Sequence, residues 1–160
     1  MRVLGVGWFG WGMKERTVTS DQLECKEEGG EDVHYHEGTL FTGRVEDFDE
    51  NGQKLHACNF NEGLLDGLWT WWHTNGNKMG EANWKEGNLG LVTSWYKNGK
   101  KERVGNWKDG KVISFEVWRQ NGETCPVTNV KDGNGVLAWY DFELWPEGGH
   151  LTYKDGERVC

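Results

Sequence analysis

Glycine recurs along most of this chain at intervals of twenty-three or twenty-four residues. The members of this column are Gly63, Gly87, Gly110, Gly133 and Gly156. Each follows an aromatic or apolar residue by three positions, and the first four follow an asparagine by four. Self-similarity at a period of roughly 20–50 residues is the mark of a repeat protein. The spacing therefore predicts about five repeat units.

A second column consists of Asn-Gly pairs, at Gly52, Gly76, Gly99 and Gly122. Asn-Gly between strand-like runs is the strongest short-range hairpin signal, because both residues tolerate the positive φ of a type I′ turn. From Gly87 onward the first column ends in Lys-Asp-Gly or Lys-Glu-Gly, which suits the same turn. Turns that alternate in this way predict an all-β repeat protein, an antiparallel meander of stacked β-hairpins.

Stacking explains why such units occur together. A lone hairpin cannot bury its apolar face, whereas stacked hairpins line up like residues across neighbouring strands. We expect the asparagines four residues before the glycines to bond backbone groups. The fourth unit departs from the pattern, with Cys125-Pro126 in its second strand. Proline there suits an edge strand or a bulge, and terminal repeats are commonly atypical.

Residues 66–87, DGLWTWWHTNGNKMGEANWKEG, resemble the MORN-variant repeat of bacterial proteins labelled YwqK-family antitoxins. Residues 90–110 fit that repeat equally well, and the resemblance covers roughly residues 18–156. It implies an elongated, twisted MORN-like sheet for the repeat array of residues 38–160. Residues 1–37 form a partly acidic N-terminal segment, in which we expect Trp8 and Trp11 to cover the exposed first edge of the sheet. The resemblance also implies a binding function, although the antitoxin label names no toxin.

The acidic charge is concentrated in one part of the chain. The formal net charge is −8, and residues 21–50 hold eleven acidic residues against two basic ones. Such a block repels nucleic acid and attracts basic surfaces. We therefore take Glu46, Asp47 and Asp49 as candidate contacts for a basic partner. A solvated acidic face that serves only solubility is the alternative.

The eleven tryptophans supply the second set of candidates. Alternation along a strand places Trp69 and Trp71 on one face and Trp72 on the other, and it likewise separates Trp95 from Tyr96. These rings either form the core of the fold or leave one row exposed as a binding stripe, where Trp and Tyr dominate binding energy. The candidate binding residues are Trp69, Trp72, Trp95, Tyr96 and Trp118.

No catalytic or metal-binding motif accompanies these columns. The sequence has no nucleophile elbow, phosphate-binding loop or paired zinc histidines. His34 and His36 share one face of a strand, and we expect them to face solvent. The four cysteines are too widely spaced for a disulfide framework. We therefore expect a non-enzymatic protein without cofactor or metal, located in the cytoplasm, with no signal peptide and no membrane span.

These features predict a protein-binding repeat module, with an antitoxin that masks a basic toxin as its most specific form. The alternative is a repeat module that binds glycans of the cell wall or a membrane surface. The net charge of −8 opposes contact with anionic lipid. The oligomeric state stays open.

Overall fold

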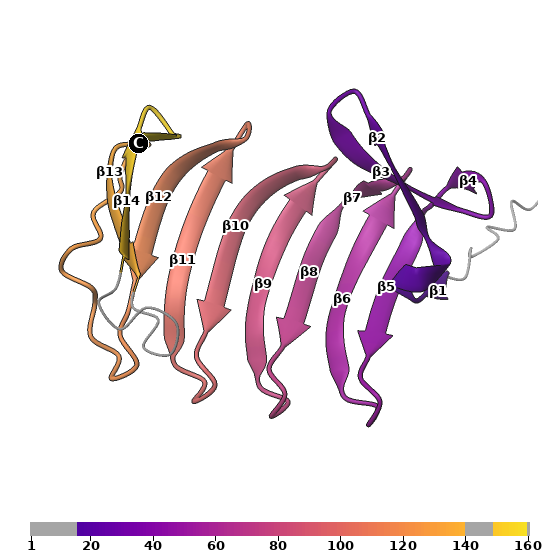
Figure 1. Ribbon diagram of the computed structural model, residues 1–160, viewed down its shortest axis with the longest axis horizontal. Coiled ribbons are helices and arrows are strands. Elements are labelled where there is room, and N and C mark those ends of the chain that lie inside the picture. The colour runs from indigo at the N-terminus through magenta and orange to yellow at the C-terminus, as the bar shows by residue number, and fades with distance from the viewer. Residues whose placement is uncertain (1–15, 140–148, 160) are drawn as a thin grey trace, which may run out of the picture.

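The computed structural model describes residues 16–139 and 149–159, and these are nearly all β-strand (Figure 1). The main sheet has nine strands, in the order β1-β5-β6-β8-β9-β10-β11-β12, with β7 beside β6. Its strands are β1 (Thr17–Val18), β5 (Gly43–Phe48), β6 (Lys54–Asn61), β7 (Leu64–Leu65), β8 (Gly67–Trp72), β9 (Lys78–Lys85), β10 (Asn88–Trp95), β11 (Lys101–Lys108) and β12 (Lys111–Val117). Every pair from β5 to β12 is antiparallel, and β1 alone pairs in parallel, with β5. The predicted all-β repeat fold is confirmed.

Two three-stranded sheets flank the main one. The N-terminal sheet contains β2 (Glu24–Glu28), β3 (Glu31–His36) and β4 (Thr39–Leu40), and the 3-10 helix η1 (Ser20–Gln22) precedes it. The C-terminal sheet contains β13 (Gly135–Trp139), β14 (Gly149–Lys154) and β15 (Glu157–Val159). Figure 1 shows them at opposite ends of the main sheet. The division at residue 37 stays a prediction, and residues 1–15 lie outside the described ranges.

The turns at the Gly63 column have the predicted conformation. In each of the five, the residue before the glycine and the glycine itself both have positive φ, as in Glu86 (49°) with Gly87 (77°) and Asp109 (51°) with Gly110 (74°). Two consecutive positive φ angles define the type I′ turn, whose twist matches that of the flanking strands.

The Asn-Gly turns differ from the prediction of a two-residue type I′ turn, which is wrong here. Only their glycines have positive φ, such as Gly76 at 84° and Gly99 at 79°. The amide of Gly99 donates to the carbonyl of Tyr96 at 2.8 Å, and the Tyr96 amide donates to the carbonyl of Lys100 at 2.9 Å. This is a three-residue loop, a type I turn followed by a left-handed glycine.

The asparagine side chain explains why this loop is preferred. Asn98 accepts a hydrogen bond from the amide of Lys100 at 3.0 Å, which closes an Asx turn. Its amide group donates to the carbonyl of Gln120, in the next repeat, at 3.4 Å. Asn75 repeats the arrangement with the carbonyl of Lys97 at 3.0 Å. These two Asn-Gly loops are therefore also tied to their neighbours in the stack.

Of the asparagines four residues before the glycines of the Gly63 column, Asn59 and Asn129 bond strand backbone. Asn59 donates to the carbonyl of Leu68 at 3.2 Å, and Asn129 accepts from the amide of Val136 at 2.7 Å. The expectation is confirmed for these two positions.

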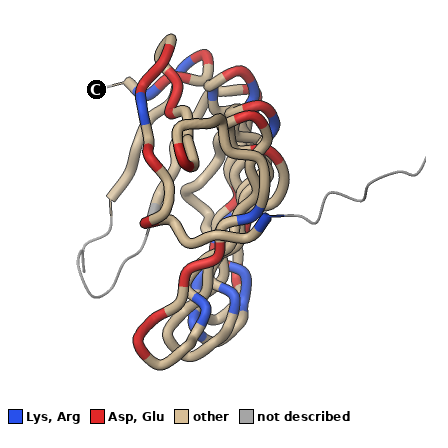
Figure 2. Tube along the Cα trace, turned by 90° about the vertical axis from the view of Figure 1, so that its right-hand side faces the viewer, with Lys and Arg blue, Asp and Glu red and all other residues tan. Residues whose placement is uncertain are grey.

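One face of the main sheet carries both flanking sheets, and we call it the capped face. Directly paired residues of neighbouring strands point to the same side. The pairings join Val45 to Cys58, and they join Trp69, Ala82, Val92, Gly105 and Phe115 in a second run. The antiparallel register of β6 and β8, which pairs His56 with Trp71, places Cys58 beside Trp69, so both runs form one row across this face. The N-terminal cluster of buried residues includes Val45 and Cys58, and the C-terminal cluster includes Phe115. Figure 2, an end-on view, shows the flanking segments on one side of the stacked strands.

The fourth unit does not complete its hairpin. Its first strand is β12, but the region that holds Pro126 forms only isolated bridges and irregular contacts. Cys125 donates to Val117 at 2.7 Å and Phe115 donates to Val130 at 3.2 Å, so the segment follows β12 without a regular ladder. Proline has no N–H to contribute to one. The predicted second strand is thus absent.

Candidate functional site

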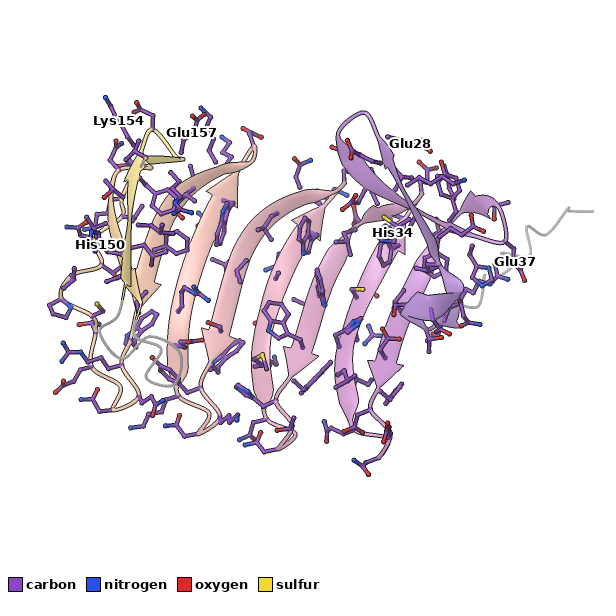
Figure 3. All side chains as sticks on the ribbon, in the orientation of Figure 1. Glu28, His34, Glu37, His150, Lys154 and Glu157 are labelled. Atoms are coloured by element: carbon purple, nitrogen blue, oxygen red, sulfur yellow. The ribbon has the colours of Figure 1, made fainter. Side chains whose placement is uncertain are left out.

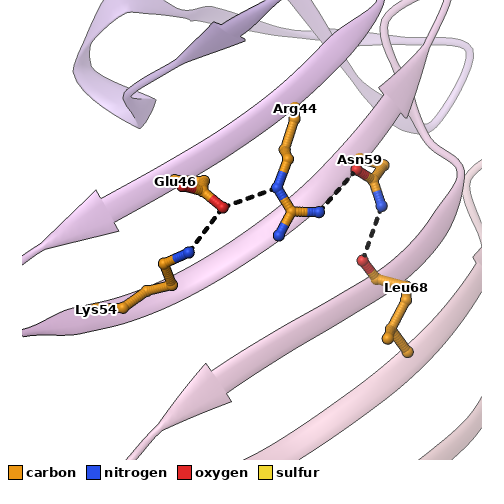
Figure 4. A network of polar contacts seen from close by, with 5 residues as sticks. All are labelled: Arg44, Glu46, Lys54, Asn59 and Leu68. Carbon is orange, nitrogen blue, oxygen red and sulfur yellow. Dashed lines mark hydrogen bonds and ion pairs between the residues drawn. The ribbon is translucent and has the colours of Figure 1, made fainter. Parts of the chain in front are cut away.

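The three acidic candidates all make contacts within the fold. Glu46 forms ion pairs with Arg44 and Lys54, both at 2.8 Å (Figure 4). Hydrogen bonds from Lys54 and then from Arg44 lower the pKa of Glu46. Asp49 accepts hydrogen bonds from the amides of Asn51 and Gln53 at 2.9 and 2.8 Å, so its carboxylate closes a turn.

Asp47 points to the other face of the sheet, where it holds η1 in place. Its carboxylate accepts a bond from the amide of Ser20 at 2.9 Å and lies 2.8 Å from Nε2 of His56. Burial acts to raise the pKa of Asp47, but the bonds from Ser20 and the contact with His56 outweigh it, so the pKa is lowered. The structure therefore does not bring Glu46, Asp47 and Asp49 together on one surface.

Trp72, Trp95 and Trp118 do share a surface, together with Phe48. Lysines alternate with these rings. Lys54 lies 5.5 Å from the ring centre of Phe48 and 5.7 Å from that of Trp72, Lys78 lies 5.3 Å from Trp95, and Lys101 lies 5.1 Å from Trp118. We call this row the cation–π ladder. Ammonium groups over aromatic faces are stabilising, and the lysine stems cover apolar ring surface. Lysine side chains of the protein itself therefore already cover part of the surface of these rings.

Tyr96 serves the stacking of repeats. Its hydroxyl donates to the carbonyl of Trp118 at 2.7 Å, in the next unit. The equivalent His73 places Nε2 2.8 Å from the carbonyl of Trp95. Both residues therefore link the Asn-Gly ends of adjacent hairpins, and a binding role for Tyr96 stays a prediction.

Trp69 lies on the capped face, away from the cation–π ladder. Its ring centre is 6.0 Å from that of Trp71 and 6.3 Å from that of Trp84. Lys54 contacts Trp72 on the other side of the sheet. The predicted separation of Trp69 and Trp71 from Trp72 is confirmed, and so is the prediction that both faces carry aromatic residues.

The exposed acidic charge gathers on the hairpin of β2 and β3, which we call the acidic hairpin. Its exposed carboxylates are Glu24, Glu27, Glu28, Glu31 and Asp32. Two of these carboxylates have partners on the hairpin itself: Lys26 lies 4.0 Å from Glu24, and the Tyr35 hydroxyl donates to Glu28 at 2.6 Å. Figure 2 shows red along this hairpin, and Figure 3 places Glu28 toward its free end. The candidate acids at the end of β5 are bound within the main sheet, whereas all five hairpin acids are exposed to solvent.

A cleft of about 560 Å³ lies between the acidic hairpin and the capped face. Its floor is aromatic and aliphatic, and its lining includes Phe60, Leu65, Trp69 and Trp84. His34 comes from the hairpin, with its ring centre 4.7 Å from that of Phe60 (Figure 3). A volume of roughly 300–1,000 Å³ with mostly apolar walls and a few polar groups is typical of ligand sites.

The sequence did not point to this cleft, because its residues come from segments far apart in the chain. The expectation that His34 and His36 face solvent is wrong for His36, which is 7 % exposed and packs on Phe41 at a ring distance of 6.1 Å. His34 is half-buried at the cleft. The two-residue period of a strand correctly predicts that both histidines lie on one face, but it cannot show that the main sheet covers this face.

Two cysteines line the cleft, and neither is an activated nucleophile. Burial, followed by the nearby Asp47 carboxylate, raises the pKa of the Cys58 thiol to about 11. Partial desolvation and then Asp32 raise the pKa of Cys25. A reactive cysteine needs a lowered pKa. Within residues 16–139 and 149–159, no three His, Cys, Asp or Glu side chains are grouped as a metal site requires.

Comparison with known families agrees with the repeat geometry. The model described as MORN repeat variant matches residues 65–86 and 88–109, which span the centre of the main sheet. MORN repeats are generally modules that bind proteins or membranes, and the family is a non-enzymatic one. A search of curated proteins found no match. In the described part of the chain, no helix has the length and apolar character to cross a membrane.

Proposed function

We propose that this protein is a non-enzymatic module that binds another protein, and that the acidic hairpin receives a basic surface of that partner. The observation that carries the proposal is the set of five exposed carboxylates on β2 and β3, with a single lysine among them. Charge of one sign on a projecting element steers a partner of opposite charge and aligns it on docking.

The rigid stack behind the hairpin supports this role. Lys–aromatic contacts and inter-repeat hydrogen bonds hold the hairpins of the main sheet against each other. A pre-organised surface loses little conformational entropy on binding. In its most specific form, the proposal is that the partner is a basic toxin whose active surface is covered, as the resemblance to antitoxins implies.

Two further parts of the proposal follow from the chemistry of the chain. The reduced thiols of Cys25 and Cys58 suit the cytoplasm. The exposed carboxylates oppose nucleic acid and anionic membranes as partners.

The test compares two triple variants that each remove three negative charges. Glu24→Gln/Glu27→Gln/Glu31→Gln changes the acidic hairpin. The control, Asp109→Asn/Asp132→Asn/Asp155→Asn, changes type I′ turn residues at which asparagine tolerates positive φ. The partner is captured with the wild-type chain from cells that express it, identified and purified. Its Kd is then measured at several salt concentrations.

We expect the partner to be basic and its affinity to fall with salt. The hairpin variant should bind about tenfold more weakly, from three exposed charges of up to about 1 kcal/mol each, and the control should bind as the wild type does. A partner that binds both triple variants equally well would refute the proposed docking surface.

A further inference from the structure

The cleft beneath the acidic hairpin has a chemical character that selects its ligand. Its walls include five rings, those of Trp69, Trp84, His34, His56 and Phe60. Nε1 of each tryptophan and Nδ1 of each histidine are buried and have no hydrogen-bond partner. These nitrogens are shielded from solvent, so the rings offer the cleft mainly carbon and π-electron surface. Such walls favour contact with the face of a ring over hydrogen bonding to its N–H.

The charged groups at the cleft are negative. Glu31 and Asp32 both line it, are exposed, and come from the start of β3. An oxygen of the Glu31 carboxylate lies 3.5 Å from the place that a Cβ on Gly87 would occupy, so this side chain reaches toward the opposite wall. No lysine or arginine is among the lining residues. No basic side chain of the lining therefore neutralises these two carboxylates, and a cation from outside the protein could pair with them.

We propose that this cleft binds an organic cation, with the guanidinium or ammonium head between the carboxylates and the aromatic walls. Weakly hydrated cations bind the faces of tryptophan rings, and a guanidinium group also pairs with carboxylates. Acidic groups at the mouth and π surface within supply both contacts. This inference deepens the proposed function: it rests on that function only for the source of the cation, which would be an arginine or lysine side chain of the partner.

The ligand test uses the whole chain and two matched probes. N-acetyl-arginine amide carries the guanidinium, and N-acetyl-citrulline amide has nearly the same shape without the charge. Binding is measured by calorimetry and located by NMR from the indole signals of Trp69 and Trp84. We expect saturable binding of the arginine probe, with shifts of both signals, and none of the citrulline probe. Equal binding of the two probes, or no saturable binding of the arginine probe, would overturn the proposal.

Two variants test the assigned contacts. Glu31→Gln/Asp32→Asn should lower the affinity for the arginine probe about three- to tenfold, since each exposed charge contributes modestly. The control Glu24→Gln/Glu27→Gln removes two charges from the same hairpin outside the lining, and it should change affinity less than twofold. An equal loss of affinity in both double variants would show that only the general negative charge of the hairpin attracts the probe, and it would refute the site.

Trp84→Leu removes a π surface while keeping an apolar side chain. It should lower the affinity for the arginine probe by about two- to fivefold. Unchanged affinity in a folded variant would show that the Trp84 ring does not contact the cation. Near-UV circular dichroism checks its fold. If Trp84→Leu fails to fold, the carboxylate variants decide, because they change exposed side chains.

The source of the cation is distinguished by a second series of probes. A pentapeptide, Gly-Gly-Arg-Gly-Gly, stands for a partner's side chain, and agmatine stands for a free small cation. Binding of the peptide at least as tight as that of the capped arginine supports a protein source, whereas binding of agmatine alone makes the cleft a small-molecule site. In that second case the cation site stands while its link to the protein partner fails. A partner that docks through the hairpin without competing with the arginine probe would leave the proposed function standing and remove the cation's proposed source.

Discussion

At the scale of single residues, glycine acts in this protein through two separate properties. In the Asn-Gly loops its left-handed conformation matters, as at Gly99 with φ of 79° and open space around the position of a Cβ. In the strands its small size matters, as at Gly80 and Gly105, where aromatic rings lie against the backbone. The two properties predict different consequences of substitution.

Gly99→Ala isolates the conformational effect. Because nothing lies within 4 Å of the added Cβ, only backbone strain changes. We expect a loss of roughly 1–2 kcal/mol in the free energy of unfolding, measured by urea denaturation. Gly99→Asn should recover part of it, because asparagine tolerates the left-handed region. An alanine variant as stable as the wild type would show that the loop can adopt another turn.

At the scale of elements, flat packing of tryptophan on glycine joins neighbouring strands. A Cβ on Gly80 would lie 2.2 Å from Cζ2 of Trp71, on the paired strand β8. At Gly105 the rings of Trp107 and Phe115 come within 2.5 Å of the same point. Both glycines lie in strands without positive φ, so their role there is to leave room for a ring.

Gly80→Ala should therefore cost about 1–3 kcal/mol through overpacking. In a Trp71→Leu background the same substitution should cost much less, because the smaller side chain leaves room. A double-mutant cycle by urea denaturation measures this coupling. Equal costs of Gly80→Ala in both backgrounds would show that Trp71 is not the obstacle.

At the scale of the whole molecule, the main sheet is held by nearest-neighbour contacts, and its two buried clusters lie at opposite ends. In stacked repeats each unit contacts only its neighbours, so a defect need not spread along the array. The N-terminal cluster centres on Phe41, which is 2 % exposed and lies 5.8 Å from the ring of Phe60.

Phe41→Ala should cost about 3–5 kcal/mol within that cluster. We expect hydrogen exchange to rise in β2 to β6 and to stay slow in β9 to β11, as followed by mass spectrometry. Val130→Ala, in the C-terminal cluster, should instead raise exchange in β12 and β13 and leave β5 and β6 slow. A uniform rise along the whole sheet would show that the array unfolds as one cooperative unit.

Most of the repeat architecture follows from local chemistry. Glycine spacing and turn residues predicted the hairpins and their order, and strand alternation predicted the opposite faces of Trp71 and Trp72. These are properties of neighbouring residues, because φ preferences and the two-residue period of a strand do not depend on distant contacts. The error in the Asn-Gly loops is also local, since the same dipeptide serves the two-residue and the three-residue turn.

The tertiary structure alone decided how the candidate site is built. It engaged Glu46, Asp47 and Asp49 internally and left the acids of β2 and β3 exposed, a distinction that composition does not contain. It also brought Glu31 and His34 over Trp69 and Trp84, although these pairs are far apart in the chain. Which side of a sheet a flanking hairpin covers depends on the summed packing of many side chains, and no residue pattern within one strand records it.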